Sequence, residues 1–166
     1  QPAKGQNSFI IETLPSGCML LDDKEAQTFY FRHPCNILIA GPGGSGKTEF
    51  VKKLVEWKDT LFDTPPQKVV WCYKEWQSSY TALLESVDNL KFIDGIPTQE
   101  DDIVSDPSIP HLVIFDDMLG QDEEQIKLWF TRKGHHRNAS VVYITQNLYE
   151  QTKANRTISL NAHYIV

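Results

Sequence analysis

The sequence lacks any apolar run long enough to cross a bilayer, and no N-terminal signal peptide is recognisable. Cysteine is scarce: Cys18, Cys35 and Cys72 are the three in 166 residues, and their spacing is not that of a metal site. A disulfide-rich secreted domain is therefore excluded, and we expect reduced, buried thiols in an intracellular protein.

Positive charge is also in deficit. The formal net charge is -6 and the sequence pI is about 5.3. This balance argues against a protein that coats nucleic acid over its whole surface, although it leaves room for a local basic patch. The length fits one domain with a substantial core.

The chain divides at residue 35 into a lead-in and a core. Residues 1–35 contain two short β-rich runs, "FIIETL" and "TFYFRH", separated by proline, glycine and aspartates, and these predict a β-hairpin packed on the core. Residues 36–166 form the predicted core. Because the sequence stops at Val166 inside an apolar run, we expect this core to end early at its C-terminus.

Strands and helices alternate through the core, which predicts an α/β fold with a mainly parallel sheet and helices on both faces. We expect core strands at 36–41, 68–73, 111–118, 140–146 and 163–166, with a shorter strand at 90–93. We expect helices at 47–57, at 78–87 capped by Ser78 or Ser79, from Thr98 onward, and at 121–133.

The stretch "GPGGSGKT" follows the first core strand and opens a helix, and it satisfies the phosphate-loop (Walker A) pattern completely. Glycines let successive backbone N–H groups curl around phosphate oxygens, and the helix N-terminus favours the negative charge. We expect Lys47 to reach the β- and γ-phosphates of ATP and the Thr48 hydroxyl to ligate Mg²⁺. The predicted nucleotide-binding residues are Gly41, Pro42, Gly43, Gly44, Ser45, Gly46, Lys47, Thr48 and Glu49.

Two acids end the buried run "LVIFDD" and supply the other half of such a site (Walker B). Asp116 directly follows the apolar residues and is the predicted magnesium ligand, through water. Asp117 is then placed to orient or deprotonate the attacking water. Many hydrolytic motors carry glutamate at this second place. The alternative for both acids is a solvated strand-end turn.

Gln146 ends the apolar run "SVVYIT". In the additional-strand ATPase division of the P-loop NTPase fold, one extra strand lies between the phosphate-loop strand and the metal-acid strand. We expect 140–146 to be that strand, with the Gln146 amide at the γ-phosphate or the lytic water. The alternative is a simple strand-end cap. No Asn-Lys-x-Asp run indicates guanine recognition, so ATP is favoured over GTP.

The stretches "GPGGSGKT", "VIFDDM", "HHRNASVVYITQNLYEQ" and "NRTISLNAHYIV" resemble the viral DNA-packaging ATPases of the FtsK–HerA superfamily. The likeness is to the poxvirus-type branch found in Polinton/Maverick elements, adintoviruses and virophages. It implies an ATP-driven motor that works as a homo-oligomeric ring, a pentamer or hexamer, and moves double-stranded DNA into a capsid through portal or vertex proteins. It also implies residence in the infected host cell, in nucleus or cytoplasm, or with the virion, and no membrane partner.

The resemblance further implies an arginine, just before the strand of Gln146, that reaches a neighbouring subunit's ATP. In the basic stretch "RKGHHR", His135 stands where that arginine often lies, which leaves Arg137 and Arg132 as candidates, with Arg156 as a third. Solvated residues at a helix end are the alternative. The stretch joins the helix after the acids to the strand of Gln146, and we interpret this place as the rim of the nucleotide site.

Two other functions compete with genome packaging. One is an ATPase that remodels nucleic acid in replication. The other is a monomeric P-loop kinase of small molecules, which the acidic pair and the Gln146 strand disfavour.

Overall fold

The computed structural model describes residues 29–118, 122–146 and 152–166. Six parallel strands form one sheet in the order β3-β2-β4-β5-β1-β6. The strands are β1 (Asn36–Ala40), β2 (Lys68–Tyr73), β3 (Leu90–Asp94), β4 (His111–Asp116), β5 (Ala139–Thr145) and β6 (Tyr164–Ile165). The predicted α/β fold with a mainly parallel sheet is therefore confirmed.

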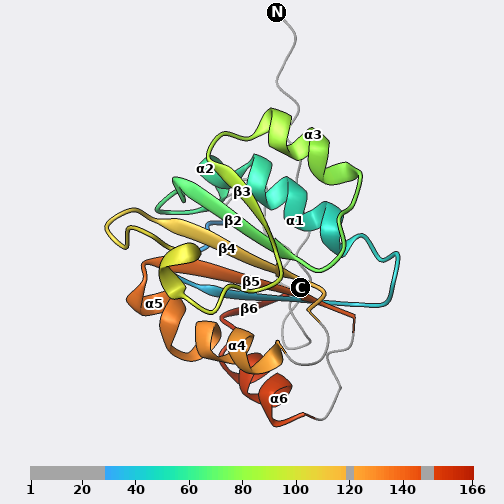
Figure 1. Cartoon of the computed structure of the whole chain (residues 1–166), viewed down its shortest axis with the longest axis vertical. Helices are drawn as coiled ribbons and strands as arrows, with labels where there is room; N and C mark the ends of the chain where they lie inside the picture. Colours follow the sequence, from blue (N-terminus) through green and yellow to red (C-terminus); the bar gives the residue numbers. More distant parts are fainter. Residues whose placement is uncertain (1–28, 119–121, 147–151) are drawn as a thin grey trace, which may run out of the picture.

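Helices cover both faces of the sheet (Figure 1). α1 (Lys47–Glu56), α2 (Lys58–Leu61) and α3 (Ser79–Ser86) lie on one face. The other face carries α4 (Glu123–Leu128), the π-helical turn η2 (Trp129–Lys133), α5 (Gly134–His136), α6 (Lys153–Leu160) and the 3₁₀ turn η1 (Glu100–Asp102). No helix in these described ranges is long and apolar enough to span a membrane.

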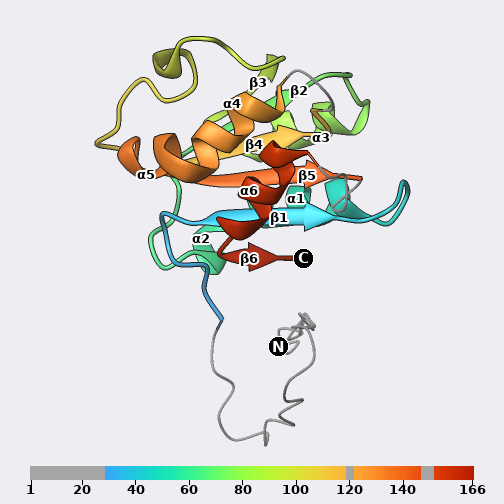
Figure 2. The ribbon, with the colours of Figure 1, turned by 90° about the horizontal axis from the view of Figure 1, so that it is seen from below.

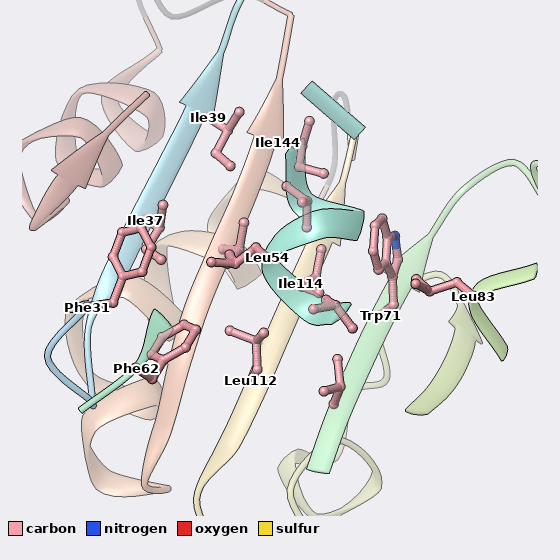
Figure 3. Packing of buried hydrophobic residues seen from close by; sticks show 14 of the residues in the cluster. Phe31, Ile37, Ile39, Leu54, Phe62, Trp71, Leu83, Leu112, Ile114 and Ile144 are labelled. Carbon is pink, nitrogen blue, oxygen red and sulfur yellow. The ribbon is translucent and has the colours of Figure 1, made fainter. Parts of the chain in front are cut away.

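Two apolar layers hold the helices to the sheet, because alternate strand residues point to opposite faces. Ile37, Ile114 and Ile144 pack with Leu54 of α1 on the first face, as Figure 3 shows. Leu38, Val113 and Tyr143 pack with Trp129 and other residues of the second face. Because central strands are buried on both sides, they read in the sequence as continuous apolar runs.

β5 lies between β1 and β4, as the additional-strand division requires. Its residues pair with β1 from Asn36↔Val141 to Ala40↔Thr145, and with β4 as far as Asp116↔Ile144. The end of β5 therefore lies between the end of the phosphate-loop strand and the end of the strand of acids. This is the predicted place of Gln146.

In a parallel sheet all carboxyl ends of the strands lie at one edge and all amino ends at the opposite edge. The phosphate loop and the basic stretch lie at different edges. The phosphate loop follows the carboxyl end of β1, whereas α5 lies beside the amino ends of the strands (Figure 2). The basic stretch from Arg132 to Arg137 precedes the start of β5 and so lies at the amino edge. Our interpretation that it borders this chain's own nucleotide site was wrong, because the seven residues of β5 run between them.

Several predicted elements differ from the structure. From Thr98 onward there is only the 3₁₀ turn η1, with Gln99 before it in an extended conformation. The strand at 163–166 is a two-residue edge strand, β6, and not a core strand. The Ser78 side chain makes no capping hydrogen bond to α3. Sequence reasoning missed α6, whose N-cap Thr152 accepts a hydrogen bond from the backbone of Asn155.

The predicted helix at 121–133 begins at Glu123 and continues without a break to His136 through the π turn. Within that turn the Phe130 carbonyl oxygen accepts a hydrogen bond of 2.7 Å from Nδ2 of Asn36, at the start of β1. The N-terminal hairpin lies largely outside the described residues. Of its second arm, the structure gives a single parallel bridge between Phe31 and Phe62.

Among the glycines that the structure describes, Gly134 has the least room for a side chain. A Cβ atom there would lie 2.7 Å from Cγ2 of Val141 and 2.9 Å from the carbonyl oxygen of Trp129. We expect Gly134→Ala to lower the free energy of unfolding by about 1–3 kcal/mol, as overpacking does. Thermal and urea unfolding would measure it. Gly43→Ala is the matched control, since a Cβ there meets nothing within 4 Å, and an equal loss in both variants would contradict the packing argument.

Both cysteines within the described ranges are buried free thiols, as expected. Burial raises the pKa of Cys35 to about 11 and that of Cys72 to about 12. Cys18 lies outside the described residues.

Candidate functional site

The phosphate loop connects β1 to α1 at the carboxyl edge of the sheet. Gly44 and Gly46 have φ angles of 74° and 89°, in the left-handed region that favours glycine. Gly46 is also the N-cap of α1, and no side chain caps the helix there. The first N–H groups of this ten-residue helix therefore face the loop, which is the arrangement that binds phosphate.

Lys47 is the first residue of α1, and its side chain turns back over the loop. Its Nζ donates hydrogen bonds to the carbonyl oxygens of Gly41 at 2.6 Å and Pro42 at 2.7 Å. Thr48 is partly buried in the same first turn. Glu49 is paired with Lys52 at 2.8 Å on the solvent side of α1, so its side chain does not line the loop.

Asp116 ends β4 and is buried, with 5% of its surface exposed. Oη of Tyr80 donates to its Oδ2 at 2.6 Å, and Nε1 of Trp71 donates to the same oxygen at 3.3 Å. Burial raises the pKa of Asp116, while the hydrogen bonds and the positive charge of Lys47 act in the opposite direction. The predicted metal ligand and the phosphate-loop lysine thus lie within electrostatic range of each other.

Asp117 and Gln146 are in direct contact. Nε2 of Gln146 donates to Oδ2 of Asp117 at 3.0 Å. Asp117 has a φ angle of 49°, an unusual conformation for a residue with a side chain, and unusual conformations gather at functional sites. Its Oδ1 is buried and has no hydrogen-bond partner within the described residues. One carboxylate oxygen is thus held by the amide, and the other is left for a water, a metal ion or a substrate.

A cavity of about 340 Å³ adjoins these acids. Its lining residues are Lys74, Glu75, Gln77, Tyr80, Asp116 and Asp117. The cavity lies at the carboxyl ends of β2 and β4, beside the phosphate-loop side of the sheet. There is therefore space next to the acids for a ligand.

The residues present suit Mg²⁺. The described ranges contain no group of three His, Cys, Asp or Glu side chains that would form a cage for a metal ion. Mg²⁺ is usually held by one or two carboxylates and by substrate phosphates, keeping several waters, so a cage is not what it requires. Thr48, Asp116 and the unpartnered Oδ1 of Asp117 supply hard oxygen atoms of the right kind.

The three candidate arginines differ in their surroundings. Nε of Arg137 lies 3.0 Å from Oε2 of Glu100, and its Nη1 lies 2.6 Å from Oδ1 of Asp101. The hydrogen bonds that Arg137 donates to Asp101 and Glu100 raise its pKa. Arg132 and Arg156 are exposed, and neither forms an ion pair within the part of the chain that the structure describes. None of the three touches this chain's own phosphate loop.

Sequence reasoning missed Tyr80 and Trp71, which touch the Asp116 carboxylate. Both stand in apolar stretches and read as core residues, so no local pattern marks them. Glu123 was missed too: it is buried and accepts hydrogen bonds from Thr152 at 2.8 Å and from Asn155 at 3.3 Å, which joins α4 to α6.

No protein-family model and no curated protein matches the chain. Solved structures do. The cytoplasmic domain of EssC matches with a TM-score of 0.53 at 14% identity, over 80% of this chain and 31% of that one. The fold is that of a P-loop ATPase domain. PCH-2 of C. elegans matches with a TM-score of 0.52 at 16% identity, over 79% of this chain and 34% of the other. ATPases 2 and 3 of EssC from Geobacillus thermodenitrificans match with a TM-score of 0.52 at 12% identity, over 80% and 32%.

The chain spans about a third of the length of each of these proteins. At such identities the likeness establishes the architecture.

Proposed function

We propose that the protein is an ATPase that binds Mg²⁺–ATP and works as a DNA-translocating motor. The observation that carries the proposal is the contact between Gln146 and Asp117 at the carboxyl edge, beside a complete phosphate loop. Three neighbouring strands, β1, β5 and β4, bring the phosphate loop, Gln146 and the two acids to one edge of the sheet.

Each group has a role in hydrolysis. The amides of the phosphate loop and Nζ of Lys47 bind the phosphates, and to do so Lys47 exchanges its bonds to Gly41 and Pro42 for phosphate oxygens. Asp117 accepts a proton as water forms a bond to the γ-phosphorus and the bond to ADP breaks. Gln146 orients Asp117 and that water. When bound by Thr48 and Asp116, Mg²⁺ would neutralise charge on the phosphate oxygens.

The DNA-packaging part of the proposal rests on the motifs that resemble the poxvirus-type branch of the FtsK–HerA superfamily. By this proposal the chain assembles with copies of itself into a ring around double-stranded DNA, and a capsid portal or vertex protein is its partner in the infected cell. The exposed Arg132 supports an arginine acting on a neighbour, because it lies at the edge of the sheet away from its own phosphate loop.

A nucleic-acid-remodelling ATPase of replication is the second candidate, and the same site would serve it. A small-molecule kinase is disfavoured by the second acid, Asp117, which simple kinases of this class usually lack, and by the Gln146 strand that contacts it.

Steady-state ADP formation with and without duplex DNA tests the proposal. We expect turnover without any added acceptor, a several-fold rise with duplex DNA, and a rise in turnover per subunit with protein concentration. Lys47→Ala, which removes the phosphate-binding ammonium, is the background control and should give none of these. A requirement for a nucleoside or sugar acceptor would overturn the proposal. Stimulation by single strands alone would favour the replication ATPase.

A further inference from the structure

We propose that Tyr80 is a positioning residue for the magnesium site, whose hydroxyl fixes the orientation of the Asp116 carboxylate. This inference rests on the proposed function, since it concerns the metal that Asp116 would help to hold. It assigns a role in the ATPase site to α3, a helix that carries no nucleotide motif.

The two donors to Asp116 converge on one oxygen. Oη of Tyr80 at 2.6 Å and Nε1 of Trp71 at 3.3 Å both reach Oδ2. A carboxylate held by one donor can still turn about its Cβ–Cγ bond. Two donors that approach the same oxygen from different elements, α3 and β2, define the plane of the group and hence the direction of Oδ1.

Tyr80 is itself held in place by aromatic neighbours. Its ring stacks on Phe92 with centroids 4.7 Å apart and planes 24° apart. The rings of Trp71 and Trp76 lie 5.3 Å and 5.4 Å away, the latter edge-on. The side chain is fully buried, so its rotamer is fixed by packing. The hydroxyl is therefore a rigid donor, as the partner of a metal-binding carboxylate has to be.

The competing explanation is that the Tyr80 hydroxyl donates to Asp116 only because a buried hydroxyl needs a hydrogen-bond partner. The two roles differ in what they change. A structural role would lower stability and weaken nucleotide binding equally with and without metal. A positioning role weakens only the metal-dependent part, because the phosphate loop binds phosphate through groups that Tyr80 does not touch.

The experiment measures the affinity of a non-hydrolysable ATP analogue in Mg²⁺ and in EDTA for the full chain and for Tyr80→Phe. We expect the gain in affinity that Mg²⁺ confers to fall by about 10–100-fold in Tyr80→Phe, which is the usual cost of losing a partner of a metal ligand. Affinity in EDTA should stay unchanged. The EPR spectrum of Mn²⁺ in the bound complex should also change.

Tyr73→Phe is the matched control. It removes a hydroxyl from a ring 5.9 Å from that of Tyr80, and the Tyr73 hydroxyl makes no hydrogen bond to Asp116 among the described contacts. In an Asp116→Asn background, Tyr80→Phe should have no further effect on the Mg²⁺ gain. A Mg²⁺ gain equal to that of the wild type in Tyr80→Phe would overturn the inference.

If Tyr80→Phe does not fold by circular dichroism, Trp71→Phe takes its place. Its longer hydrogen bond predicts a smaller but measurable loss, and no loss would equally overturn the inference. Absence of ATP binding by the wild-type chain would instead refute the proposed function. The two failures are therefore distinguishable.

Discussion

Asp117→Asn should lower ATP turnover by about 10³-fold, which lies within the range that a general base contributes. The asparagine side chain cannot take up the proton of the attacking water. It can still accept the hydrogen bond that Nε2 of Gln146 makes to Asp117, because its amide oxygen is also an acceptor. Asparagine also tolerates the left-handed backbone of this position, where φ is 49°. The fold and the affinity for ATP should therefore be unchanged, so that the variant binds ATP without hydrolysing it.

Single-turnover hydrolysis and equilibrium binding of labelled ATP would separate these two effects. Asp88→Asn is a suitable control, since Asp88 is exposed before the start of β3, at the other edge of the sheet. Turnover by Asp117→Asn within tenfold of the wild type would exclude Asp117 as the base. Loss of ATP binding would instead show that its carboxylate serves mainly to hold the nucleotide.

Arg132→Ala should abolish the concentration-dependent part of the ATPase activity, a loss of about 10³-fold for an arginine acting on a neighbour's phosphate. Arg137 was the first candidate from the sequence, but its guanidinium is already bound to Glu100 and Asp101 of its own chain. To reach another subunit it would have to break the ion pairs with both carboxylates. Arg132 is exposed and forms no ion pair within the described ranges, so it can reach a neighbour without breaking one.

A mixing experiment makes the test decisive. Subunits with Lys47→Ala keep Arg132 but have no working phosphate loop. Subunits with Arg132→Ala keep the phosphate loop but lack the arginine. Each should be inactive alone, and the mixture should recover activity. Arg137→Ala and Arg156→Ala should remain within about tenfold of the wild type. A severe loss in Arg137→Ala at unchanged thermal stability, with Arg132→Ala active, would reverse the assignment.

The sequence was sufficient for the sheet and for most of the carboxyl edge. β1, β2, β4 and β5 are continuous apolar runs because both of their faces are covered, and this pattern is visible without any structure. The contact of Asp117 with Gln146 follows from the same logic, since ends of adjacent parallel strands meet at one edge. The place of β5 between β1 and β4 followed from the fold division that the motifs indicated, whereas the places of the other strands were not predicted.

Other features of the site could not be predicted from the sequence, because they depend on contacts between residues far apart in the chain. Tyr80 contacts Asp116 across 36 positions, and Arg137 pairs with Glu100 across 37. The π turn at Trp129–Lys133 has the composition of an ordinary helix, and the Phe130 carbonyl group within it accepts a hydrogen bond from the distant Asn36. The segment after Thr98 has a good helix start but forms only a 3₁₀ turn, after which Ile103 and Val104 are buried in the second apolar layer.

The phosphate loop lies at the carboxyl ends of the strands and Arg132 and Arg137 lie toward the amino ends, which has a consequence for symmetry. If an arginine of one copy touches the phosphate bound to another, the contact joins two different surfaces, in a heterologous, head-to-tail manner. In this head-to-tail arrangement the two surfaces of one copy face different neighbours, unlike the reciprocal contacts of a two-fold dimer. Each added copy leaves one donor surface and one acceptor surface unmatched, until the rotation per copy closes a circle or continues as a helix. A pair of copies would therefore contain one complete site and one incomplete site.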